Sequence, residues 1–340
     1  MITIDGSQGE GGGQVLRSSL TLSVMTGQPF EIYNIRSNRK KPGLQPQHLK
    51  CVEAAAVICK AEQKGAAIGS TRLIFSPGKV NPGNYQVDIG TAGSTSLVLQ
   101  TIFLPLSFSN DESTVTITGG THVPWSPVFH YLDLQWLPVL RQSGFDMKIT
   151  LKLAGFYPKG GGRIVAHIKP VRRLKPLDLL ERGKLVKLRG ISAAANLDSS
   201  VIERQTIQML KRLSKRNIEC NIKKETMISR WKNTMALLCA EYENGGGCFT
   251  ALGALGKRAE KVANEAVDEL LEYVGTSGCV DKYLADQLLL PLVFIDGKSC
   301  YRTAKITRHL LTNRDVIQQF TNVDIHIEGK SGQEGIVRIG

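Results

Sequence analysis

The order of apolar and polar residues divides the chain into short strands and amphipathic helices that recur in a fixed succession. Residues 2–35 are predicted to form a strand, a glycine-rich loop, a helix and a second strand. A helix over 47–63 and two short strands at 66–68 and 71–76 follow. In that helix the apolar residues lie three and four positions apart, which is typical of a helix with one buried face.

The same βαβαββ order returns roughly 80 residues later, between 85 and 168, with a long helix predicted over 126–141. A third copy is predicted to begin with a strand at 185–190 and is then interrupted. It resumes with a helix over 281–290 and ends with a strand at 335–339. Repeats of this size indicate a shared supersecondary building block.

The interrupting segment has strands and helices of its own, including a helix over 257–274 with a continuous apolar stripe. We therefore predict an α/β (α+β) fold in which three βαβαββ repeats form a large domain from residues 1–184 and 278–340. Residues 185–277 are predicted to form a smaller α/β domain inserted in the third repeat.

Composition narrows the class of protein. Hydrophobic residues make up 42% of the chain and charged residues 21%, which excludes a disordered or collagen-like chain. No apolar run approaches the ~18 residues of a membrane span, and the N-terminus lacks the pattern of a signal peptide. The seven cysteines are scattered without a C-x-x-C pair, which favours reduced thiols over zinc sites or disulfide frameworks. We expect a cytoplasmic protein with no membrane partner.

The formal net charge of +13 favours an anionic partner such as a nucleotide or a nucleic acid. Four cations and no acid lie in the segment 36–48, whose proline and glycine residues fix its course. Arginine and lysine side chains in such a segment can hold phosphates, and Arg17 could join them from the preceding helix. A solvated basic loop is the alternative.

The loop Gly9–Gly13 separates a strand from a helix, where backbone amides and the helix N-terminus favour an anion. Its spacing matches neither a G-x-G-x-x-G fingerprint nor a Walker A loop. Glu10 is the only carboxylate in it and could hold a divalent cation against phosphates. The alternative is an ordinary glycine turn with a solvated glutamate.

Two further groups could carry chemistry. Tyr283, Asp286 and Gln287 lie three and four residues apart, so they share one helix face that could bind a nucleoside. His309 follows Arg308 at a predicted helix start, where a phosphate formed on the imidazole would be stabilised. The alternatives are a half-buried helix anchored by a tyrosine and a purely structural histidine.

In combination these stretches resemble the RNA 3′-terminal phosphate cyclases. The matching stretches span nearly the whole chain in order: 6–17, 36–49, 93–101, 283–288 and 309–313. The resemblance implies three repeats, each like the C-terminal domain of the third bacterial translation initiation factor, and a smaller domain inserted in the third. The family's activity makes a 2′,3′-cyclic phosphate from an RNA 3′-phosphate and ATP, through histidine–AMP and RNA–adenylate intermediates.

The resemblance also implies a role for each matching residue. His309 matches the nucleophile, and Glu10 would bind Mg²⁺ or Mn²⁺ together with the ATP phosphates. The nucleoside pocket would be lined by Gln100, Pro127, Tyr283, Leu284, Ala285, Asp286 and Gln287. Phosphates of ATP or of the RNA end would be held by Arg17, Arg36, Arg39, Gln47 and His48. The segment 121–131 departs from the family's more usual small and acidic residues.

Other classes of protein stay open at this point. One is a cyclase-like protein of ribosome assembly, a non-catalytic branch that lacks the histidine retained here. Others are an enolpyruvyl transferase and a plain RNA-binding module. An imidazole must be neutral to attack, so with a pKa near ~6.5 adenylation is expected to fail in more acid solution.

Overall fold

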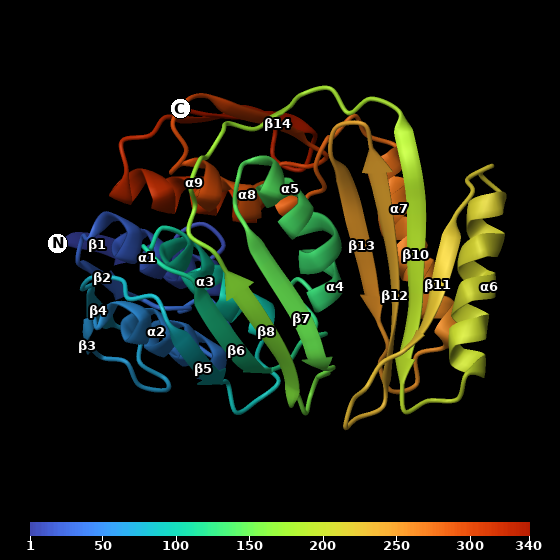
Figure 1. Ribbon diagram of the computed structural model, residues 1–340, viewed down its shortest axis with the longest axis horizontal. Helices are drawn as coiled ribbons and strands as arrows, with labels where there is room; N and C mark the ends of the chain where they lie inside the picture. The colour runs from blue at the N-terminus through green and yellow to red at the C-terminus, as the bar shows by residue number, and fades with distance from the viewer.

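The computed structural model describes residues 1–340 as four four-stranded sheets with helices packed on them (Figure 1). This arrangement confirms the predicted α/β class. Strands and helices alternate along the first part of the chain, and both termini lie on the side of the molecule away from α6 (Figure 1). None of the helices combines the length and the apolar character needed to cross a bilayer.

Three of the sheets share one topology. In each of them the first and second strands, counted along the chain, are parallel. The second strand also pairs antiparallel with the fourth, and the fourth pairs antiparallel with the third. The first repeat consists of β1 (Ile2–Asp5), α1 (Gly13–Thr26), β2 (Phe30–Tyr33), α2 (Pro46–Cys59), β3 (Glu62–Lys64) and β4 (Leu73–Ser76). The second consists of β5 (Asn84–Asp88), α3 (Thr95–Ser107), β6 (Ser113–Gly119), α4 (Phe129–Tyr131), α5 (Leu137–Gln142), β7 (Met147–Leu153) and β8 (Gly162–Ile168).

The third repeat begins earlier than the sequence pattern predicts. Its first strand is β9 (Asp178–Leu179), which pairs parallel with β14. Two residues are too few to show any alternation, so the pattern missed this strand. The remaining elements are α8 (Leu284–Leu292), β14 (Ser299–Thr303), α9 (Arg308–Phe320), β15 (Ile325–Gly329) and β16 (Gly335–Ile339). The predicted strand at 185–190 is instead the start of β10, which belongs to the fourth sheet.

Two other local expectations were wrong. The segment 126–141 is not one regular helix, because a π-helical turn at Leu132–Trp136 separates α4 from α5. Pro138 has no backbone N–H to continue the ordinary hydrogen-bond ladder there, which favours the wider turn. The strand expected at 66–68 lies instead at β3, where Gln63 pairs with Phe75.

The fourth sheet is formed by the segment between β9 and α8. Its elements are β10 (Leu185–Ala195), α6 (Ser200–Ser214), β11 (Asn221–Thr226), β12 (Asn233–Tyr242), β13 (Gly246–Leu252) and α7 (Ala259–Val274). The strand order is β11-β10-β12-β13, which differs from the order of the repeats. Both helices pack on one face of the sheet, where Leu238 meets Met209 and Leu270 in a separate apolar cluster.

The other face of this sheet packs against the rest of the protein. Along β12 the side chains alternate, so Met235 and Leu237 join the main apolar core while Ala236 and Leu238 face α6 and α7. In a strand that is buried on both faces, apolar residues do not alternate with polar ones, because neither face meets water. This is why residues 234–240 are buried without a break and read as a continuous apolar run.

Asp281, just before α8, joins three parts of the chain. Its buried carboxylate accepts hydrogen bonds from the Tyr131 hydroxyl at 3.0 Å and from the backbone N–H groups of Tyr283 at 2.8 Å and Leu284 at 2.9 Å. The N–H of Cys248, on β13, donates to it at 3.3 Å. Burial raises the pKa of Asp281 to about 6, although the hydrogen bonds oppose this shift. The carboxylate therefore fixes the start of α8 against the second repeat and the fourth sheet.

Replacing Asp281 with alanine leaves four donors without this acceptor, three of them buried. We expect Asp281→Ala to lower the free energy of unfolding by about 3 kcal/mol, measured by urea denaturation. The control is Asp268→Ala, which removes only a largely exposed pair with Arg212 and should cost about 0.5 kcal/mol or less. Equal losses in the two variants would contradict the role given to Asp281.

Candidate active site

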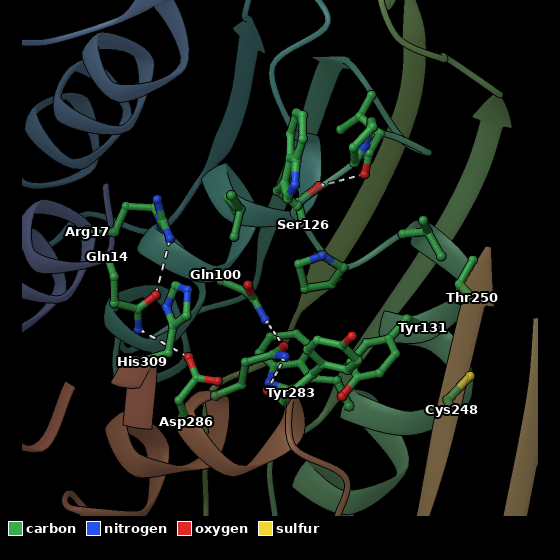
Figure 2. A pocket seen from close by; sticks show the side chains of 18 of the residues that line it. Gln14, Arg17, Gln100, Ser126, Tyr131, Cys248, Thr250, Tyr283, Asp286 and His309 are labelled. Atoms are coloured by element: carbon green, nitrogen blue, oxygen red, sulfur yellow. Dashed lines mark hydrogen bonds between the residues drawn. The ribbon is translucent and has the colours of Figure 1, made fainter. Parts of the chain in front are cut away.

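A cavity of about 660 Å³ lies between helices of the repeats and strand β13 (Figure 2). Helices α1, α3, α8 and α9 provide one side of it, the loop before α4 another, and β13 the far wall. Seven residues expected from the sequence to act in the site line the cavity: Arg17, Gln100, Pro127, Tyr283, Asp286, Gln287 and His309. Residues from distant parts of the chain thus meet at one place.

His309 is the second residue of α9, whose N-cap Thr307 accepts a hydrogen bond from the Leu310 N–H at 3.1 Å. The imidazole is half exposed, and its Nε2 lies 2.7 Å from Oε2 of Glu10. This hydrogen bond raises the pKa of His309, while partial burial opposes the shift. The ring therefore stays protonated to a higher pH than the sequence alone suggested.

The glycine loop is fastened to α9, which is how Glu10 reaches His309. Gly9 has a φ of +59°, and a Cβ there would lie 2.2 Å from Oγ1 of Thr312. The Glu10 N–H donates to the same Thr312 oxygen at 3.1 Å. Arg39 also contacts the Glu10 carboxylate. Although burial favours the neutral form, the hydrogen bond and charge of His309 and the charge of Arg39 keep the pKa of Glu10 below its usual range.

Asp286 lies near His309, in the first turn of α8 (Figure 2). Gln14 donates to its carboxylate at 3.3 Å, and Arg17 donates to Gln14 at 3.2 Å. Asn313 donates to the Asp286 backbone carbonyl at 2.8 Å, which ties α8 to α9. Burial raises the pKa of Asp286 to about 6, opposed by the positive charges of His309 and Arg17.

The next part of the cavity is built from amides and an aromatic ring. Gln100 donates to the Gln287 side chain at 2.6 Å, and Gln287 donates to the Tyr283 carbonyl at 2.6 Å (Figure 2). The Tyr283 ring is 44% exposed, and its hydroxyl donates to Glu269 on α7 at 3.0 Å. Leu284 and Ala285 are fully buried in α8, and their side chains do not reach the cavity.

The basic segment 36–48 contributes to the site without lining the cavity. Arg36 donates to the Lys41 carbonyl at 3.1 Å, and neither residue lines the cavity. The side chain of Gln47 accepts the Ser94 N–H at 2.7 Å, so it supports the loop before α3. His48 is buried beneath Gly13, and burial together with Arg17 and Arg36 lowers its pKa to about 3. Gln47 and His48 thus lie behind the site, where they support its loops.

Several lining residues were not anticipated. Gln14 directly follows the glycine loop and Asn313 lies one turn after His309, so the sequence did contain a signal for both. Cys248, Thr250 and Lys257 come from the fourth sheet and the loop after it. Nothing local marks these three, because their place depends on how that sheet packs against the repeats.

No group of three or more histidine, cysteine, aspartate or glutamate side chains could by itself hold a metal ion. Glu10 offers one carboxylate at the His309 end of the cavity, 20% exposed and flanked by arginine. A single carboxylate suits a hard cation such as Mg²⁺ or Mn²⁺ that takes its other ligands from phosphates and water. The residues present therefore fit a cation of this kind.

Comparisons with known proteins point to one family. The family model described as RNA 3′-terminal phosphate cyclase matches residues 8–327. Proteins named RNA 3′-terminal phosphate cyclase from Pyrococcus furiosus and Thermococcus onnurineus are 43% and 44% identical, each over 100% of this chain and 98% and 99% of their own. One from Gloeothece citriformis is 41% identical over 97% of both chains. The enolpyruvyl transferase NikO from Streptomyces tendae covers 50% of this chain and 33% of its own at 12% identity, with a TM-score of 0.30, which is too low to indicate a shared fold.

The contact between His309 and Glu10 predicts a measurable titration. In metal-free solution, the His309 ring should lose its proton above the ~6.5 of an unpaired histidine, because Glu10 stabilises the charged form. In Glu10→Gln that pKa should fall. Imidazole chemical shifts followed by NMR against pH provide the measurement, with the exposed ring of His326 as a signal that should not differ between the two proteins. Identical His309 curves would contradict the contact.

Proposed function

The chain belongs to the RNA 3′-terminal phosphate cyclase family, and from this premise we propose that it uses ATP to convert an RNA 3′-phosphate into a 2′,3′-cyclic phosphate. It is an enzyme of this class, and the class implies RNA and ATP as its substrates. We also propose the route by which the AMP group is transferred. AMP is carried first by His309 and then by the RNA phosphate, and it leaves when the ring closes.

The observation that supports this route best is the position of His309. Its half-exposed imidazole lies at a cavity that also exposes Gln14, Arg17 and Asp286. Covalent catalysis splits one difficult displacement into easier ones, and an imidazole is a suitable carrier because it both attacks and leaves readily. Before it attacks, the ring must lose a proton, and its Nε2 can act as the nucleophile only after it separates from Glu10.

Each step balances. A ring nitrogen of His309 attacks the α-phosphorus of ATP, a P–N bond forms, and pyrophosphate leaves. An oxygen of the RNA 3′-phosphate then attacks that phosphorus, and the P–N bond breaks to free the imidazole. The adjacent 2′-hydroxyl finally attacks the 3′-phosphorus and gives up its proton, and AMP departs. The net reaction consumes one ATP and yields AMP, pyrophosphate and the cyclic end.

We assign the nucleoside of ATP to the part of the cavity between Tyr283 and Pro127. The exposed Tyr283 ring offers a stacking face, and the hydrogen-bonded amides of Gln100 and Gln287 offer donors and acceptors at its edge. Asp286 lies between this region and His309. The backbone around Leu284 and Ala285 would contribute rather than their buried side chains.

We assign the phosphates to the His309 end of the cavity. Arg17 and Arg39 provide positive charge there, with Arg36 further out along the same loop. Glu10 would hold Mg²⁺ or Mn²⁺, which when bound neutralises phosphate charge and polarises the α-phosphorus. Gln47 and His48 then have a positioning role, through the contacts with Ser94 and Gly13. We also propose that residues 185–277 form an inserted domain that closes the cavity with β13.

The histidine route predicts covalent labelling. Incubation with Mg²⁺ and ATP radiolabelled at the α-phosphate should leave label on the denatured chain that is labile in acid and stable in alkali. His309→Ala should lose this label, whereas His326→Ala should retain it. Label absent from protein that binds ATP would overturn the route and favour the non-catalytic RNA-binding alternative.

The nucleoside assignment predicts a separate effect. Tyr283→Ala should raise the KM for ATP in the labelling reaction roughly tenfold, because base–aromatic stacking is lost, while the maximal rate changes less. Tyr283→Phe keeps the ring and loses only the hydrogen bond to Glu269, so its KM should stay near that of the wild type. A KM unchanged in Tyr283→Ala would place the base elsewhere.

A further inference from the structure

Three loops near the cavity display aromatic and basic side chains that the proposed reaction does not use. We define the loop platform as Trp125, Tyr157, Lys159, Arg230, Trp231 and Lys232. Trp125 is 96% exposed, Tyr157 62% and Trp231 41%. Large apolar rings gain nothing from such exposure in an isolated protein, so a cluster of them indicates a binding surface.

The loops are joined to one another by backbone contacts. The N–H groups of Thr121 and His122 both donate to the Gly155 carbonyl, at 2.9 and 3.0 Å, which holds the loop of Trp125 against that of Tyr157. The Ala154 N–H donates to the Ile228 carbonyl at 2.8 Å, which holds the loop of Tyr157 against that of Trp231. The three loops therefore form one continuous surface.

The platform is positively charged as well as aromatic. Lys159, Arg230 and Lys232 are exposed, and none of them forms an ion pair with an acidic side chain. No acid occurs within 154–163 or 226–233. The Lys159 ammonium lies 5.7 Å from the centroid of the Trp231 ring, so charge and ring face are presented together. Stacking rings combined with unpaired cations are the features that bind single-stranded nucleic acid.

The platform also connects to the site. Trp125 itself lines the cavity, and its φ of +58° is rare for a bulky residue. The next residue, Ser126, lies across the cavity from Asp286 and Tyr283 (Figure 2). At the neighbouring loop, a Cβ on Gly160 would lie 2.8 Å from Cα of Ala92, beside the loop that Gln47 supports. A strand whose 3′-phosphate lies near His309 would leave the cavity at these loops.

We propose that the loop platform binds the single-stranded RNA that precedes the 3′-phosphate, with bases stacked on Trp125 and Trp231 and phosphates held by Lys159, Arg230 and Lys232. This inference rests on the proposed function, because it takes RNA as the substrate. It gives the inserted segment a part in RNA binding, since Arg230, Trp231 and Lys232 lie between β11 and β12. It also gives the sequence departure at 121–131 a role in substrate binding.

The test measures binding separately from chemistry. Single-stranded RNA of roughly 12 nucleotides with a 3′-phosphate and a 5′ fluorophore is titrated with full-length protein, and anisotropy is followed without ATP. Trp125→Ala and Trp231→Ala should each weaken binding roughly fivefold or more. Trp231→Ala should bind a 3′-phosphorylated dinucleotide as the wild type does. Ile207→Ala, which removes an exposed apolar side chain from α6, is the matched control and should change nothing.

A second measurement tests the charges. The triple variant K159A/R230A/K232A should lower the slope of log affinity against log salt by about 2, because three phosphate contacts are lost. The triple variant K211A/K215A/R216A removes the same charge from the exposed end of α6 and should keep the slope.

The outcomes separate the two proposals. Wild-type RNA affinity in both tryptophan variants would overturn the platform, whether or not ATP labels the protein. Loss of RNA affinity with normal ATP labelling in these variants supports both proposals. Loss of affinity in the variants, with no labelling even of the wild type, would support the platform and overturn the histidine route.

Discussion

A single buried carboxylate determines where α8 begins, the helix that brings Asp286 and Gln287 to the cavity. Asp281 lies in the interior with no exposure to solvent, so it persists only because each of its oxygens accepts hydrogen bonds. The donors come from the second repeat, from β13 and from the first turn of α8 itself. That turn sets the orientations of Tyr283 and Asp286. These two side chains in turn set the width of the cavity. A displacement of either neighbouring sheet would leave donors unpaired, which makes the arrangement stiff.

The sequence predicted the repeats because each supplies the same succession of strand and helix patterns, and the shared sheet topology explains why that succession recurs. Its failures have local causes. β9 is too short to show a period, and Pro138 changes a helix that apolar spacing alone describes as regular. The sequence indicated strands within 185–277, but not that β12 is covered on both faces or which elements cover it.

The residues of the site also fall into those that the sequence could indicate and those that it could not. Residues that lie in a glycine loop or begin a helix, such as Glu10 and His309, could be selected from sequence, and they meet in the structure at 2.7 Å. Gln47 and His48 lie in an equally suggestive basic segment, yet their side chains are used to hold backbone and to fill space under Gly13. Charge density along a chain does not distinguish a side chain that faces a cavity from one that supports it. The contribution of β13 could not be predicted at all, because packing between two sheets places it there.

The fastening of the glycine loop to α9 has a consequence for protein synthesis. The Glu10 N–H and the Thr312 hydroxyl that accepts it are 302 positions apart, so the contact joins two segments that are translated far apart in time. A nascent chain in which α9 has not yet been translated has its glycine loop. It lacks both the Thr312 hydroxyl that fastens this loop and the His309 imidazole beside it. The same holds for any product of premature termination before α9. The pair formed by Glu10 and His309 at the end of the cavity is therefore completed only after α9 has been translated.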